Sequence, residues 1–177
     1  MDPIYLLKET GLFEECKTVL DVGARNGGIS SRLVELGRQV DAIDVKSPKT
    51  EIAGVTFETI SVEDFLLKNT KRYDLVIARH VMHYLDNPRE VIAGLNNISG
   101  IFFFTCFGPQ DDWADKVTVL SHDEVLAMFK PESVKHHSEA FQYGKTYVGD
   151  TKYWHINTFV IDNSEFPRKD LGLVIDD

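Results

Sequence analysis

The chain has 177 residues, of which 43% are hydrophobic and 27% are charged, and its formal net charge is −9 at pH 7. These values fit one globular domain over residues 1–177 and argue against a nucleic-acid partner, because nucleic-acid binding gains most of its affinity when Lys and Arg neutralise phosphates. No apolar run approaches the roughly 20 residues of a membrane span. Since the N-terminus lacks a signal-peptide pattern and the two cysteines suggest no disulfide framework, we expect a cytoplasmic protein without a membrane partner.

Apolar periods of strand and helix type alternate along the chain, which is typical of an α/β domain with a mostly parallel sheet. The pattern predicts helices at 3–15, 27–37, 62–69, 87–97 and 121–129, and seven strands at 17–22, 39–44, 54–60, 73–79, 100–107, 133–142 and 152–162. The last two strands are expected to form an antiparallel hairpin at the end of the sheet. Residues 163–177 are polar and are expected to form a loosely held tail.

The first predicted strand leads into a glycine-rich turn, Asp21-Val-Gly-Ala-Arg-Asn-Gly-Gly28, and then into a helix. The next strand ends in Asp44, 21 positions after Gly23. A glycine turn lets backbone N–H groups approach a ligand, and an acid at the tip of the second strand can accept hydrogen bonds from ribose hydroxyls. The order of these features predicts a cleft for a nucleoside-containing cofactor.

The residue at the middle of the turn narrows the choice of cofactor. Arg25 stands where the dinucleotide fingerprint has its second glycine, which lets the backbone approach a pyrophosphate. S-adenosylmethionine has no pyrophosphate, and its ammonium group can pair with the carboxylate of Asp21. The turn resembles the first motif of the class I S-adenosylmethionine-dependent methyltransferases, roughly Asp-x-Gly-x-Gly-x-Gly. Asp21, Gly23 and Gly27 match this motif, and Arg25 departs from it.

The resemblance continues along residues 15–162. Asp44 ends the second strand as in that family, and the segment around Ser61 looks like its adenine-contacting loop, where Glu63 can replace the acid that many members have at the position of Ser61. Residues 73–88 look like the fourth strand and the short helix after it. Within the family, the chain is most similar to small-molecule methyltransferases of the tellurite-resistance-like type.

The resemblance implies a Rossmann-like methyltransferase fold, with a mostly parallel seven-stranded sheet, a C-terminal antiparallel hairpin and helices on both faces. It also implies S-adenosylmethionine as the cofactor and a small molecule as the methyl acceptor. The cofactor-binding residues that it implies are Asp21, Gly23, Ala24, Arg25, Asn26, Gly27, Asp44, Ser61, Val62, Glu63 and Arg79.

Arg25 has three interpretations. Its side chain can be a solvated loop residue, it can bind the methionine carboxylate of the cofactor through paired hydrogen bonds, or it can obstruct the site.

His80 and His83 follow the fourth strand, where the transferring methyl group is expected. Either imidazole can remove a proton from the acceptor, and the alternative is that one packs against the short helix while the other is exposed. Tyr84 is expected in the core. Asp111 and Asp112 follow the fifth strand, where they can either hold a cationic substrate or begin a helix.

Two functions are compatible with these residues. The first is methyl transfer from S-adenosylmethionine to a small-molecule acceptor. The alternative is a non-catalytic S-adenosylmethionine-binding sensor or partner subunit, which the departures at Arg25 and Ser61 favour. No metal site is expected, because His80 and His83 alone are too few ligands.

Overall fold

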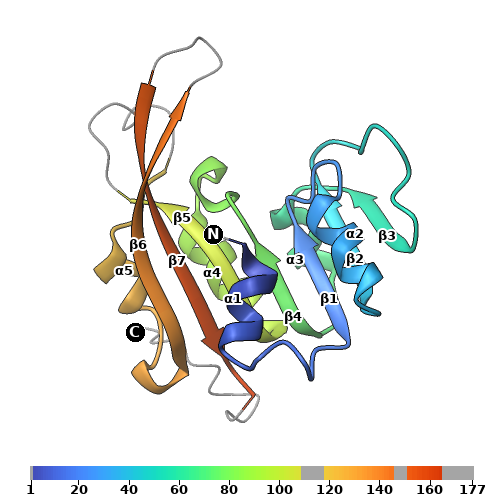
Figure 1. The fold of residues 1–177 in the computed structure, drawn as a ribbon, viewed down its shortest axis with the longest axis horizontal. Helices are drawn as coiled ribbons and strands as arrows, with labels where there is room; N and C mark the ends of the chain where they lie inside the picture. The colour runs from blue at the N-terminus through green and yellow to red at the C-terminus, as the bar shows by residue number, and fades with distance from the viewer. Residues whose placement is uncertain (1, 109–117, 146–150, 165–177) are drawn as a thin grey trace.

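The computed structural model describes residues 2–108, 118–145 and 151–164, and for residues 141–145 and 151–154 it describes the backbone alone (Figure 1). The helices in these ranges are α1 Pro3–Glu9, α2 Gly28–Glu35, α3 Val62–Lys68, α4 Pro88–Asn97 and α5 His122–Leu126, with the short 3-10 helices η1 Met82–Tyr84 and η2 Pro131–Ser133. The strands are β1 Thr18–Val22, β2 Gln39–Asp44, β3 Val55–Thr59, β4 Tyr73–Ala78, β5 Ser99–Phe107, β6 Val134–Lys145 and β7 Thr151–Asp162. None of the described helices is long and apolar enough to cross a membrane.

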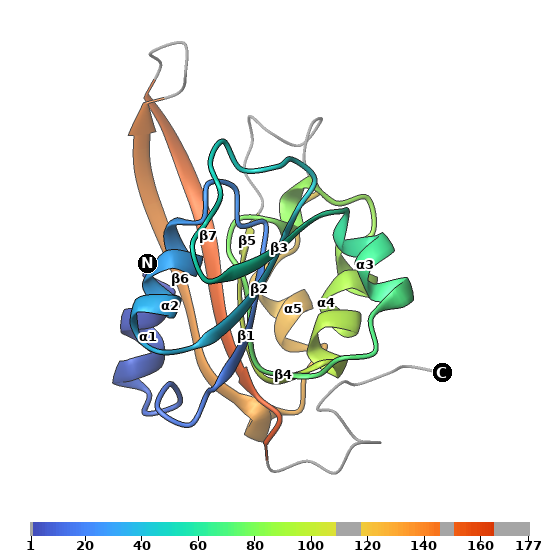
Figure 2. The ribbon, with the colours of Figure 1, turned by 90° about the vertical axis from the view of Figure 1, so that its right-hand side faces the viewer.

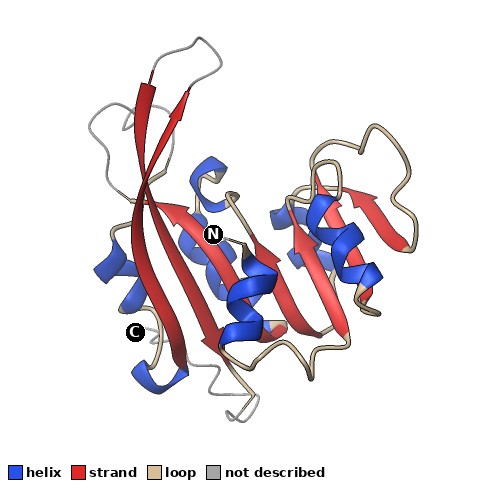
Figure 3. Ribbon diagram, in the orientation of Figure 1, coloured by secondary structure: helices blue, strands red, loops and turns tan. Residues whose placement is uncertain are grey.

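The strands form one seven-stranded sheet in the order β3-β2-β1-β4-β5-β7-β6 (Figure 3). The first five strands run parallel, and β7 pairs antiparallel with both β5 and β6. The predicted mostly parallel sheet and its C-terminal hairpin are therefore confirmed. The strand order reverses between β1 and β4, and in open α/β sheets ligands bind at the carboxyl ends of the strands beside such a point.

Helices cover both faces of the sheet, with α1 and α2 on one side and α3, α4 and α5 on the other (Figure 2). Successive residues of a strand point to opposite faces. In β5, Phe102 and Phe104 accordingly enter the core that contains α3 and α4, whereas Ile101 and Phe103 enter the core that contains α1. Burial on both faces explains why the central strands are continuous apolar runs.

Three predicted helices end two or more residues earlier than expected, and one of them, expected over 27–37, ends at Glu35. The first was expected over 3–15 but ends at Glu9, because Gly11 follows with φ +72°, a left-handed conformation that stops a helix. The helix expected over 121–129 ends at Leu126.

The end of β7 extends the ordered part of the chain past the expected start of the tail. Asn163 is buried, and its side-chain amide donates to Oδ1 of Asn96 at 2.8 Å. Its backbone N–H also donates to the carbonyl of Gly100 at 2.7 Å. These bonds fix Asn163 to the sheet and to α4, and residues 165–177 lie outside the described residues.

Candidate functional site

The glycine turn after β1 is held against the end of β2. The backbone N–H groups of Gly23 and Ala24 both donate to the carbonyl of Ile43, at 2.8 and 3.2 Å. Gly23, Arg25 and Gly27 all have positive φ, at +75°, +53° and +76°. The turn thus needs a left-handed backbone at three positions, and a non-glycine residue takes the middle one at a cost of about 1–2 kcal/mol.

Two apolar side chains from other loops lie directly on this turn. A Cβ added at Gly23 would overlap the side chain of Val81, and one added at Gly27 would overlap the side chain of Ile52. Ile52 is 7% exposed in a segment, 45–54, that is otherwise largely exposed. The glycines are therefore required by close packing as well as by φ. Nothing in the sequence pattern had singled out Ile52 or Val81.

Asp44 lies at the tip of β2, where its carboxylate is fixed by two backbone groups. Its Oδ2 accepts from the N–H of Arg25 at 2.9 Å, and its Oδ1 accepts from the N–H of Lys46 at 3.0 Å. An ionised carboxylate has about four lone-pair positions, so each oxygen can accept a further hydrogen bond. Asp44 is partly exposed and can offer these positions to a ligand.

Asp21 lies beneath the same turn and is 2% exposed. Its Oδ2 accepts a 2.5 Å hydrogen bond from the hydroxyl of Ser30 in α2. Burial raises the pKa of Asp21 to about 6, against the lowering effect of the Ser30 hydrogen bonds. A cation that reached this carboxylate would favour its ionised form. Ser30 was not predicted from the sequence, because a serine in the first turn of a helix has many ordinary uses.

The predicted adenine-contacting segment begins beside Asp44. The N–H of Ile60 donates to the backbone carbonyl of Asp44 at 2.9 Å, so the chain leaves β3 beside the end of β2. Ser61 caps α3 by accepting from the N–H of Asp64, Val62 is buried in the core, and Glu63 is exposed. Of these three side chains, only that of Glu63 is free of a packing or capping role.

The segment after β4 brings Arg79, His80 and His83 to the same edge. His80 has φ +57°, and its N–H donates to Oγ1 of Thr105 in β5 at 2.8 Å. Burial, followed by the positive charges of Arg79 and Arg25, lowers the pKa of His80 to about 4. His80 is therefore neutral at pH 7, and it can accept a proton.

His83 is 2% exposed and stacks on Phe107, with ring centroids 3.8 Å apart. Burial, and after it His80 and Arg25, lower the pKa of His83 to about 4. This position favours the packing role that the sequence had left open for one of the two histidines. Tyr84 was expected in the core, but it is 67% exposed, because η1 turns its side chain outwards.

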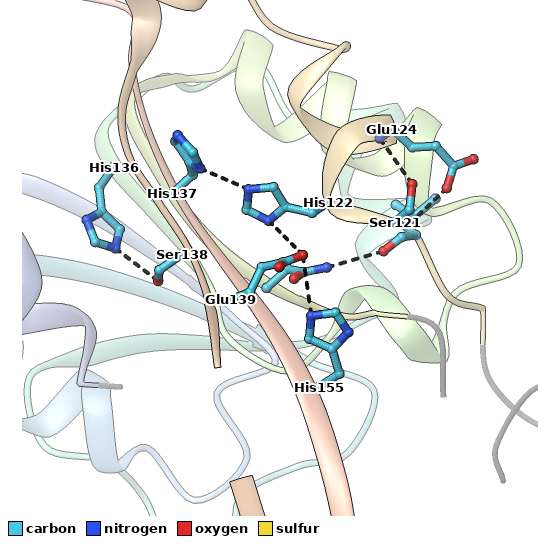
Figure 4. A network of polar contacts seen from close by, with 10 residues as sticks. Ser121, His122, Glu124, His136, His137, Ser138, Glu139 and His155 are labelled. Carbon is cyan, nitrogen blue, oxygen red and sulfur yellow. Dashed lines mark hydrogen bonds and ion pairs between the residues drawn. The ribbon is translucent and has the colours of Figure 1, made fainter. Parts of the chain in front are cut away.

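A second polar network lies on α5 and the hairpin (Figure 4). Nε2 of His122 lies 2.9 Å from Nδ1 of His137, and Oε1 of Glu139 lies 3.7 Å from Nδ1 of His122 and 3.4 Å from Nε2 of His155. His137 and its neighbour His136 both lie in β6. Among the described residues, no three His, Cys, Asp or Glu side chains are placed to hold a metal ion.

The structure thus gathers the glycine turn, Asp21, Asp44, Glu63, Arg79 and His80 at the carboxyl ends of four adjacent strands. Cys106 in β5 is buried. Asp111, Asp112 and Trp113 lie outside the described residues, so the expectations for them stay expectations.

A family model described as "Methyltransferase domain" matches residues 5–146. Among curated proteins, the Ubiquinone biosynthesis O-methyltransferase of Glaesserella parasuis serovar 5 is 28% identical over 114 residues, which are 55% of this chain and 48% of that protein. The Malonyl-[acyl-carrier protein] O-methyltransferase of Halalkalibacterium halodurans is 27% identical over 111 residues, 54% of this chain and 41% of that protein. The chain spans about half the length of the curated relatives it matches.

Solved structures also resemble this chain in fold. TehB from Haemophilus influenzae superposes with a TM-score of 0.68 at 14% identity, over 89% of this chain and 61% of that one. An S-adenosylmethionine-dependent methyltransferase from Methanosarcina mazei superposes with a TM-score of 0.62 at 12% identity, over 92% of this chain and 98% of that one. At these identities the likeness establishes the fold.

Proposed function

Because the chain belongs to the methyltransferase domain family, we propose that it transfers the methyl group of S-adenosylmethionine to a small-molecule acceptor. The observation that carries this proposal is the carboxylate of Asp44, which the N–H groups of Arg25 and Lys46 fix at the tip of β2. Its two remaining acceptor positions suit a pair of ribose hydroxyls. The names of the similar proteins, several of which are methyltransferases, support the same reaction.

The other side chains at this edge suit the rest of the cofactor. Asp21, beneath the turn, can pair with the ammonium group, and Arg25, which is exposed, can bind the methionine carboxylate through paired hydrogen bonds. We assign the adenine to the segment Ser61–Glu63, with Glu63 as the polar contact. Gly23, Ala24, Asn26 and Gly27 line the turn, and Arg79 completes the rim beside β4.

The cofactor supplies a methyl group that its sulfonium already activates, so the chain's own task is to position the acceptor and to accept its proton. His80 is neutral at pH 7 and lies beyond the end of β4, where it can take that proton. A base with a pKa of about 4 holds a proton weakly, so His80 passes it on to water. His83 stacks on Phe107, and this contact positions the loop that carries His80.

Titration with S-adenosylhomocysteine tests the assignment of Asp44. In Asp44→Ala the affinity should fall at least about tenfold, since charge-assisted hydrogen bonds contribute roughly 1.5–3 kcal/mol each. Asp41→Ala is the matched control, because Asp41 lies earlier in β2 and accepts from Lys71 and Tyr73, each at 2.8 Å. Equal affinity in folded Asp44→Ala would refute the ribose assignment. Binding without turnover of S-adenosylmethionine on any acceptor would favour the sensor over the enzyme.

A further inference from the structure

Two arginines at the carboxyl edge, Arg25 and Arg79, have no acidic partner among the described residues, although the chain is strongly acidic. Of the other described arginines, Arg32 pairs with Asp2, Arg38 with Glu14 and Arg89 with Glu124, whereas Arg72, which precedes β4 at the opposite edge, has no ion pair either. Across the part of the chain that the structure describes, no ion pair involves Arg25 or Arg79. Both side chains are exposed. In a protein with a net charge of −9, two unpaired guanidinium groups at one site favour an anionic ligand.

The fold places these two cations in one site. Val22 and Ala78 are paired in the parallel β1–β4 ladder, so the turn with Arg25 and the loop that starts with Arg79 leave neighbouring strand ends. The side chain of Val81 lies directly on Gly23, which joins the loop to the turn.

Backbone strain marks the same two loops. Among the described non-glycine residues, Arg25 and His80 are the ones with positive φ, at +53° and +57°. Such conformations cost of order 1–3 kcal/mol and persist where the surrounding structure holds them, often at ligand sites. The strained residues flank the point where the strand order reverses, so the strain favours a ligand between the two loops.

We propose that the methyl acceptor is an anion, and that Arg79 binds its carboxylate or phosphate group while Arg25 holds the carboxylate of the cofactor. This inference rests on the proposed function, and it moves Arg79, which the family resemblance had placed among the cofactor-binding residues, to the acceptor. S-adenosylmethionine has a single carboxylate, which leaves one guanidinium for the acceptor. Arg79 directly precedes His80, so an anion bound there lies beside the group proposed to take the acceptor's proton.

Aromatic side chains in the loop that follows Arg79, and the ring that His80 faces, suggest the probe for a test. Tyr84 is exposed, and His80 lies with its ring centroid 6.0 Å from that of Phe107. The probes are therefore benzoate, phenyl phosphate and the uncharged benzamide, titrated by NMR into the protein saturated with S-adenosylhomocysteine. Benzoate and phenyl phosphate distinguish a carboxylate from a phosphate as the recognised group.

At least one of the two anions should bind saturably and more tightly than benzamide. Arg79→Gln should weaken that binding about tenfold, as expected for the loss of a charge-assisted hydrogen bond. The matched control is Arg72→Gln, because Arg72 is an exposed arginine that precedes β4 at the opposite edge, and it should leave binding unchanged. Failure of both anions to bind, equal binding of benzamide, or unchanged binding in Arg79→Gln would overturn the proposal. If S-adenosylhomocysteine itself does not bind, the proposed function fails, and the same titrations on the ligand-free protein still test Arg79.

Discussion

Arg25→Gly should change stability and cofactor affinity in opposite directions. Arg25 has φ +53°, a conformation that costs an L-residue about 1–2 kcal/mol and costs glycine almost nothing. Glycine loses about 0.4–1 kcal/mol more conformational entropy on folding. The exposed Arg25 side chain buries little, and the N–H that donates to Asp44 is kept, so the variant should gain about 0.5–1 kcal/mol. For a domain of this size that raises Tm by about 1–4 °C.

Affinity for S-adenosylhomocysteine should fall about tenfold in the same variant, because it lacks the guanidinium that we propose holds the methionine carboxylate. Arg25→Ala is the matched control. It removes the guanidinium but keeps a Cβ at positive φ, so its affinity should fall equally while its Tm does not rise. Calorimetry and thermal unfolding measure both quantities. A gain in affinity for Arg25→Gly would refute the reasoning and show that Arg25 obstructs the turn.

Three further predictions concern the acids and glycines of the site. Gly27→Ala should destabilise the protein by at least about 1–2 kcal/mol in denaturant unfolding, because the added Cβ stands at φ +76° and against Ile52. Gly28→Ala is the control: its added Cβ would meet nothing within 4 Å at the start of α2, so the variant should be neutral or stabilising. The pKa of Asp21 is about 6 in the folded protein and 3.8 in the unfolded chain, so the unfolded state releases this proton first and the free energy of unfolding should fall as pH rises from about 4 to 6. Asp21→Asn should remove that pH dependence. An unchanged slope in the variant would contradict the raised pKa of Asp21. Cofactor pairing with ionised Asp21 implies that affinity for S-adenosylhomocysteine should weaken below about pH 6 in the wild type but not in Asp21→Asn.

The sequence predicted the sheet because the strands it marked are long and chemically distinct. Runs such as 75–78 and 101–104 are buried on both faces, and their apolar character follows directly from that burial. The predicted end of the first helix was wrong. The apolar residues Leu12 and Phe13 continue a helix-like pattern beyond Gly11, but they pack against the core from a loop.

At the site, the sequence located the residues that carry charge or need glycine. Asp21, Gly23, Gly27 and Asp44 lie where their spacing predicted, at the carboxyl edge of β1 and β2. The contacts that close the site were not predictable, because Ile52 and Val81 meet the turn only through the tertiary fold.

The exposure of Tyr84 was also not predictable from the sequence. Its position among apolar residues predicted a core side chain, but a 3-10 helix of three residues places it outwards. Short helices have no periodicity long enough to decide which face is buried.

Binding of S-adenosylmethionine at the edge formed by β1, β2 and β4, which we propose, can be tested by one calorimetric comparison. The wild-type protein is titrated in turn with S-adenosylmethionine, S-adenosylhomocysteine and NAD. We expect saturable binding of the first two at one site per chain and no response to NAD, because Arg25 stands where a pyrophosphate needs glycine. Tight binding of NAD with no response to either S-adenosyl compound would contradict the claim.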